Sequence, residues 1–239
     1  MRACTKYVII AAVLAHTIAC ADHRERVTRE GLTEQIVSQS NGALTLLTIN
    51  KTNGYDHEQD GIKLYTLEWE ASIQVLANGW KAGWSDYRVL SARPNALDAA
   101  VSGISIKRLV HGGTVTLQGK SALQKADRGW RIFESEVTAA QILLPSSIAA
   151  LVGTWRTEAN THLFTVKQGT DGELRFVAGI PDAERVRWLE TYPVDYAGSS
   201  IIVQFAEGNA TLTQVPERGV IYTEEGAFGK QSYKVARVQ

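Results

Sequence analysis

The chain has 239 residues, with 25 Lys and Arg against 25 Asp and Glu, so its formal net charge is zero. This balance does not favour binding to nucleic acid or to an anionic membrane surface, which needs an excess of basic residues. A chain of this length can bury the core of one large domain or of two small ones.

The first residues have the order of a secretory signal. Arg2 and Lys6 make a positive start, residues 7–15 are apolar, and residues 16–19 end in small side chains. Nine apolar residues are too few to span a bilayer, which takes about 20. The sequence therefore predicts that residues 1–19 are a signal peptide and that the protein is exported. Cleavage leaves 23 basic against 25 acidic residues.

The two cysteines of the chain are Cys4, inside this segment, and Cys20, at its end, so we expect no disulfide in the folded part. The stretch 17–20 resembles the lipobox of bacterial envelope lipoproteins, with Ile18 and Ala19 in the fitting places and Thr17 where leucine is usual. The resemblance implies that Cys20 carries acyl chains (palmitate or a similar fatty acid) and anchors the protein in a membrane. Ala21 implies the cell outer membrane, and residues 20–27 would be a tether.

A competing interpretation of the same residues is ordinary signal cleavage after Ala21. Ala19 and Ala21 satisfy the rule for small residues at a cleavage site. The product would begin at Asp22 and would be a soluble periplasmic or secreted protein.

The N-terminal half begins with an amphipathic helix. Thr28 is a candidate N-cap, and Leu32, Ile36 and Val37 have helical spacing. The Asn41-Gly42 pair is typical of a left-handed helix stop. A strand at residues 43–49 and a polar loop follow.

The clearest pattern in the chain is the alternation of apolar and polar residues over 65–75, which predicts a long strand with Trp69 on its buried face. Further strands are expected at 114–119, 121–125 and 130–137, with a turn at 127–129. Together these elements predict an α+β domain over residues 28–140, one helix against a curved antiparallel sheet. Their order resembles that of the cystatin-like and NTF2-like domains.

Residues 141–151 contain Pro145 and predict a junction between two separable domains. The rest of the chain, 152–239, predicts an all-β small barrel or sandwich. Its eight strand candidates, separated by Gly, Asn, Asp and Pro, are 152–158, 162–168, 173–178, 185–190, 200–205, 210–215, 220–224 and 232–237.

Gly153 and Trp155, in the first of these strands, resemble the Gly-x-Trp motif of the lipocalins. The likeness implies a lipocalin-like barrel in which both residues are structural and close one end. Strands this short predict a barrel too tight for a roomy ligand cavity. Gly219 and Tyr222 have a weaker similarity to the small β-barrel lysozyme inhibitors of bacterial envelopes, without the serine and the cysteines of that family.

We expect no catalytic site. The sequence lacks a G-x-S-x-G elbow, an H-E-x-x-H motif and a cysteine nucleophile in its body. Glu68 and Glu70 are expected on the solvent face of one strand. The three histidines after residue 27 stand isolated in the sequence: His57, His111 and His162.

No metal or cofactor is predicted either. The loop 56–61 has the acidic spacing of a calcium loop, but Leu67 occupies the twelfth position and cannot ligate. A looser cation site at Asp56, His57 and Asp60 is the alternative. Residues 113–121 have five residues between their glycines where a phosphate-binding loop needs four.

One pair of residues is a candidate for recognition. Trp80 and Trp84 lie close together in an ill-defined stretch, and exposed tryptophans can stack on sugar rings or anchor a protein. The competing interpretation is that they seal the core. The sequence thus predicts an envelope lipoprotein that binds a protein or a cell-wall glycan. The alternatives are a carrier of a small apolar ligand in the barrel and, third, an inhibitor of a muralytic enzyme.

Overall fold

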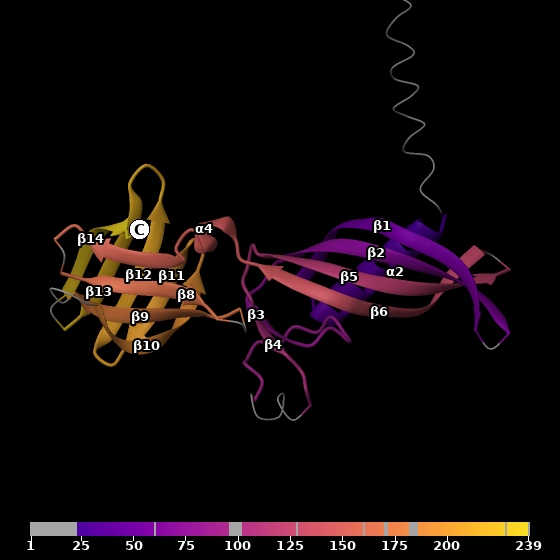
Figure 1. Ribbon diagram of the computed structural model, residues 1–239, viewed down its shortest axis with the longest axis horizontal. Helices are drawn as coiled ribbons and strands as arrows, with labels where there is room; N and C mark the ends of the chain where they lie inside the picture. Colours follow the sequence, from indigo (N-terminus) through magenta and orange to yellow (C-terminus); the bar gives the residue numbers. More distant parts are fainter. Residues whose placement is uncertain are drawn as a thin grey trace, which may run out of the picture.

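The computed structural model describes residues 23–238 except 60, 96–101, 128, 160, 170–171, 182–185 and 228; for residues 180–181 and 186–190 only the backbone is described. Cys20 and the expected signal peptide lie outside the described residues. The chain forms an N-terminal α+β domain and a C-terminal barrel that lie end to end (Figure 1).

Helix α2 (His23–Ser40) begins five residues earlier than Thr28, the N-cap expected from the sequence. Thr28 lies within the helix, and its hydroxyl donates to the carbonyl of Arg24 at 2.9 Å. It therefore does not cap the N-terminus of α2. Residues 23–27, expected to be tether, are therefore the first turns of α2. Leu32 and Ile36 are buried against the sheet, whereas Val37 is exposed. The helix ends as expected, because Asn41 has a positive φ of 51°.

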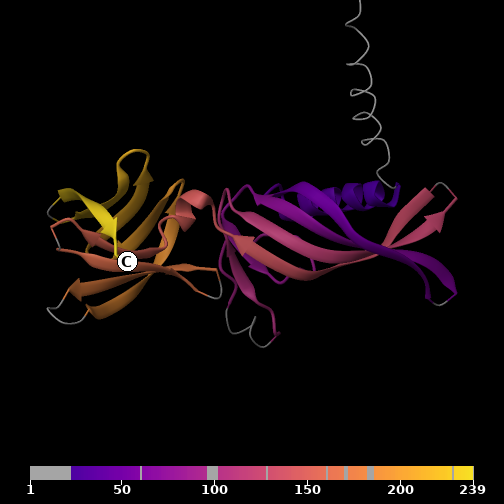
Figure 2. The same ribbon diagram turned by 45° about the horizontal axis from the view of Figure 1, so that its top comes forward.

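Four antiparallel strands form the sheet that α2 covers, in the order β1-β2-β5-β6. Their bounds are β1 (Leu44–Gln59), β2 (Ile62–Val75), β5 (Thr114–Ala126) and β6 (Gly129–Leu143). Shifts of register between β1 and β2 and between β5 and β6 mark bulges, which bend a sheet. Figure 2 shows α2 lying along one face of the curved sheet. The predicted helix against a curved antiparallel sheet is confirmed.

Two strand boundaries differ from the sequence prediction. Strand β1 continues to Gln59 through the stretch expected to be a polar loop. Strand β5 is one strand, not the two expected at 114–119 and 121–125. Gly119 is not a turn residue; it faces Trp69, whose ring would lie 2.4 Å from a Cβ atom at this position. The glycine therefore makes room for the indole within a continuous strand.

Trp69 lies at the centre of the N-terminal core. Its side chain is 1% exposed, and its indole N–H donates to the hydroxyl of Ser121 at 3.0 Å. Apolar side chains of α2 and all four strands share this core, among them Leu32, Ile36, Leu44, Ile49, Leu67, Ile73, Val115, Leu117 and Leu123. The opposite sheet face is polar, and there Lys120 forms an ion pair with Glu68 at 3.2 Å.

Between β2 and β5 the chain forms a small sheet of β3 (Gly79–Ala82) and β4 (Ile106–Leu109), which the sequence did not predict. Trp80 lies within β3 and is not in a loop. This small sheet stands where the two domains meet (Figure 1).

The C-terminal domain is a closed barrel of eight antiparallel strands, which confirms the all-β prediction in its barrel form. Each strand pairs with the next along the chain, and β14 closes the ring by pairing with β7. The bounds are β7 (Gly153–Thr157), β8 (Leu163–Gln168), β9 (Leu174–Pro181), β10 (Val186–Ala197), β11 (Ser200–Phe205), β12 (Gly208–Val215), β13 (Gly219–Gly226) and β14 (Gly229–Arg237). The short helix α4 (Ser146–Ala149) precedes β7.

We predict that Trp69→Ala lowers the free energy of unfolding of the N-terminal domain by about 3–5 kcal/mol, because it leaves a cavity in a closely packed core. Urea unfolding followed by circular dichroism measures the change. Glu70→Ala on the solvent face of the same strand is the matched control and should change stability by at most about 0.5 kcal/mol. A loss below about 1 kcal/mol for Trp69→Ala would contradict the central place of this side chain.

Candidate functional site

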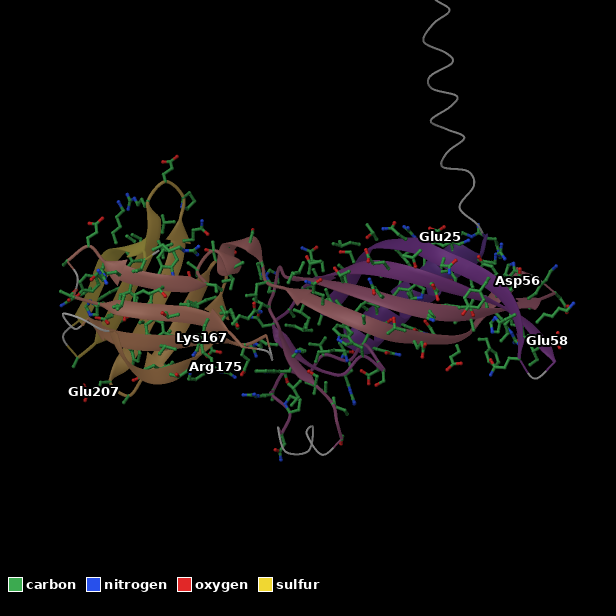
Figure 3. The ribbon with its side chains drawn as sticks, in the orientation of Figure 1. Glu25, Asp56, Glu58, Lys167, Arg175 and Glu207 are labelled. Carbon is green, nitrogen blue, oxygen red and sulfur yellow. The ribbon has the colours of Figure 1, made fainter. Side chains whose placement is uncertain are left out.

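The two ends of the barrel differ. Because the strands alternate in direction, the turns 205–208 and 226–229 lie at one end, called here the open end, while α4 lies at the other, the junction end. Figure 3 labels Glu207 at the open end, far from the N-terminal domain, and Lys167 and Arg175 nearer to that domain.

The junction end is closed by the segment that leads into the barrel. Ile148 of α4 and Leu151 are fully buried in the barrel core. The indole N–H of Trp155 donates to the carbonyl of Leu151 at 2.8 Å. The guanidinium of Arg237 donates to the carbonyls of Ala150 and Val152 at 3.1 and 2.7 Å and lies 5.1 Å from the Trp155 ring.

Gly153 has a structural reason for its identity. Its φ is +146°, a backbone conformation that residues with a Cβ atom rarely adopt, and a Cβ would lie 3.2 Å from Arg237. The Gly-x-Trp motif of the sequence thus coincides with the point where the linker, the first strand and the last strand meet.

The barrel interior is filled with aromatic side chains. Phe164 stacks on Phe176 with ring centroids 4.9 Å apart and contacts Tyr222 at 4.7 Å. Phe205 meets the edge of Phe176 at 6.0 Å. Rings at these distances leave no room for a lipid tail between them.

Above this aromatic floor, the open end is hollowed. The hollow has a volume of about 410 Å³. Among the described residues that line it, three are carboxylates and none is Lys or Arg. The lining consists of Phe205, Glu207, Gly208, Asn209, Glu224, Glu225, Gly226, Ala227, Gly229 and Gln231.

Glu224 joins this hollow to the aromatic floor. The buried Tyr222 hydroxyl donates to Glu224 Oε1 at 2.6 Å, and His162 Nε2 lies 3.4 Å from Glu224 Oε2. Burial, with a further contribution from Glu224, raises the pKa of Tyr222 above its ordinary range. The His162 ring also packs on Tyr233, with centroids 5.0 Å apart. His162, which stands isolated in the sequence, thus has Glu224 and Tyr233 as neighbours in the fold.

Trp80 connects the two domains. It is 7% exposed, and the guanidinium groups of Arg93 and Arg108 lie 5.2 and 4.8 Å from its ring. Arg108 also lies 5.5 Å from the ring of Tyr196 in the barrel, and Arg93 pairs with Glu173 of the barrel at 3.3 Å. Trp80 is thus enclosed by side chains of the domain junction.

Trp84 has a different environment, because it is only partly buried and lines two hollows. One, of about 400 Å³, lies between the domains, and the other, of about 500 Å³, lies beside α2. Lys81 lies 5.2 Å from the Trp84 ring and is 1% exposed. Its ammonium pairs with Asp86 at 3.2 Å, and burial lowers the pKa of Lys81.

The other sequence candidates are placed as follows. Leu67 is fully buried and cannot ligate a cation; Asp60 of the looser cation site lies outside the described residues. Within the part of the chain that the structure describes, no three His, Cys, Asp or Glu side chains gather as a metal site would require. No described helix combines the length and the apolar character needed to cross a membrane.

Comparison with known proteins adds no assignment: no protein family, curated protein or solved structure matches the chain. Any functional assignment therefore depends on the site itself.

Tyr87, which lines the hollow beside α2, provides a pH test of this region. Burial raises the pKa of Tyr87 to about 12, against about 10 in an unfolded chain. From pH 10 to 12 the unfolded chain loses this proton while the folded chain keeps it, so folding becomes less favourable as the pH rises. We predict that the wild type loses on the order of 2 kcal/mol relative to Tyr87→Phe over this range.

Urea unfolding of both proteins at several pH values measures this difference. Between pH 7 and 9 the difference should be constant, because the phenol is protonated in both states. A constant difference up to pH 12 would contradict the burial of the Tyr87 hydroxyl.

Proposed function

We propose that this protein is an exported, lipid-anchored envelope protein that binds a small ligand at the open end of its barrel. The observation that carries the proposal is the contrast between the two ends: α4 and Trp155 fill the junction end, whereas the open end has a hollow of about 410 Å³. Ligand sites are commonly hollows of this size in the mouths of barrels.

The lining of the hollow favours a small organic cation. Glu207, Glu224 and Glu225 supply negative charge and Phe205 supplies an aromatic ring, while the hydroxyl of Tyr233 donates to Gln231 of the lining. Aromatic rings and carboxylates together attract ammonium groups. The sequence also suggested a small apolar ligand as an alternative. The packed interior argues against it, since Phe164, Phe176 and Tyr222 occupy the space that an apolar tail would need.

The cluster at the open end supports binding better than catalysis. Glu224 is held by the hydroxyl of Tyr222 and by the ring of His162, so its charge is fixed in place. Such a fixed charge can pair with a cation without the cost of ordering a mobile side chain.

The anchor proposal concerns Cys20. Since α2 begins at His23, two residues separate that helix from Cys20, and three residue steps extend at most about 11 Å. An acylated Cys20 would hold the start of α2 beside the bilayer. Glu25, near this start, is in the half of the N-terminal domain remote from the barrel (Figure 3). The open end of the barrel, where Glu207 lies, is far from this anchored start of α2 (Figure 3).

The finer fold assignments are also proposals. The order of a helix followed by an antiparallel meander supports a cystatin-like or NTF2-like N-terminal domain. Gly153 and Trp155 at the closed end support a lipocalin-like barrel.

We predict that the wild type incorporates labelled palmitate when expressed in a bacterium and that Cys20→Ser abolishes the label. Thiol acylation requires the cysteine sulfur, which serine lacks. Gel fluorography of the cell envelope fraction measures the incorporation. An unlabelled wild type, or a mature N-terminus at Asp22, would contradict the anchor and leave a soluble exported protein.

We predict that choline binds the purified protein and that Glu224→Gln weakens its binding at least tenfold, because the variant removes one negative charge from the wall of the hollow. Isothermal titration calorimetry measures both affinities. Glu217→Gln, in the turn between β12 and β13 at the junction end, is the matched control and should bind as the wild type does. Binding of laurate with no binding of choline would favour the apolar carrier instead.

A further inference from the structure

The two hollows that share Trp84 make up a second candidate site, separate from the open end of the barrel. Both are also lined by strand β6, one by residues 135–137 and the other by residues 140–142. We call this region the Trp84 groove. It lies on the N-terminal domain and reaches the barrel at Gln168 and Gly169.

The polar lining of the Trp84 groove consists mainly of amides and hydroxyls. Side-chain amides come from α2, β6 and β8, as Gln35, Gln39, Gln141 and Gln168. Hydroxyls come from Ser85, Tyr87, Ser105 and Ser135, and the charged groups are one ammonium and one carboxylate, Lys107 and Glu136. Amides and hydroxyls can both donate and accept, which suits the hydroxyl and acetamido groups of a sugar.

Trp84 is held in place from within the protein. Lys81 lies over its ring at 5.2 Å and is itself fixed by the ion pair with Asp86. Tyr87 is positioned in turn, because its backbone N–H donates to the Gln39 amide oxygen at 2.9 Å. A partly exposed indole that is fixed in this way offers a rigid surface for the apolar face of a sugar ring, at little cost in conformational entropy.

The backbone of β6 adds further polar groups. β6 is an edge strand, since the sheet order is β1-β2-β5-β6 and β6 pairs only with β5 within the described residues. An edge strand presents unpaired N–H and C=O groups. Beside the Trp84 groove these groups supply more hydrogen-bonding positions for a polar chain.

We propose that the Trp84 groove binds an oligosaccharide of N-acetylated sugars, the chemistry of a cell-wall glycan. The indole stacks on one sugar ring, and the amides of Gln141 and Gln168 pair with the acetamido groups. The site is independent of the open-end hollow, whose lining residues are all different.

The test is calorimetric titration of the whole protein with chitotetraose, a soluble oligomer of N-acetylglucosamine. Trp84→Ala should weaken binding at least tenfold, and Gln141→Leu, which changes an exposed side chain, should weaken it about three- to tenfold. Trp130→Ala removes an indole at the far end of α2 and should leave the affinity unchanged. Glu224→Gln should also leave it unchanged, which separates this proposal from that for the open end.

Unfolding curves recorded for each variant show whether it is folded, and Trp84→Phe supplies a variant that keeps an aromatic ring and should lose less affinity than Trp84→Ala. No saturable binding of chitotetraose by the wild type would overturn the proposal. Equal binding by the wild type and by folded Trp84→Ala and Gln141→Leu would also overturn it, as would binding of an extended peptide along β6 without binding of the sugar.

Discussion

The guanidinium of Arg237 holds together three parts of the chain on which the barrel depends. It donates to the carbonyls of Ala150 and Val152 in the linker and lies against Trp155 of the first strand, while Arg237 itself belongs to the last strand. Closure of the barrel brings β14 beside β7, and this contact fixes α4 across the junction end. The same end faces the N-terminal domain, so the hollow end must face away from it.

Most of the fold follows from local patterns in the sequence. The alternation around Trp69 and the eight short strands after residue 152 predicted a half-buried sheet and an all-β domain, because the period of two is a property of each strand by itself. The errors occurred where a side chain has a partner that the local pattern does not reveal. Gly119 suggested a break in a strand, but its reason is the ring of Trp69, 50 positions earlier in the sequence. Thr28 suggested a helix start, but its hydroxyl bonds back to Arg24.

The candidate sites were harder to predict, because each gathers residues from separate elements. Trp84 was a sequence candidate, yet its neighbours on α2, β6 and β8 appear only in the fold. His162 stands isolated in the sequence because Glu224 comes 62 positions later. The sequence did offer a clue to this pair. His162 and Glu224 lie at ends of predicted strands that an antiparallel barrel brings to the same end of the barrel. Buried Lys81 gave no signal, since a lysine is normally exposed.

The central claim is that the open end of the barrel is its ligand-binding end. The most direct measurement is backbone amide NMR of the labelled protein during titration with choline. The account predicts that the largest shift changes fall in residues 205–209 and 224–231, around the hollow. Changes confined to the turns at the junction end, 168–174 and 215–219, or no change at saturating choline, would contradict it.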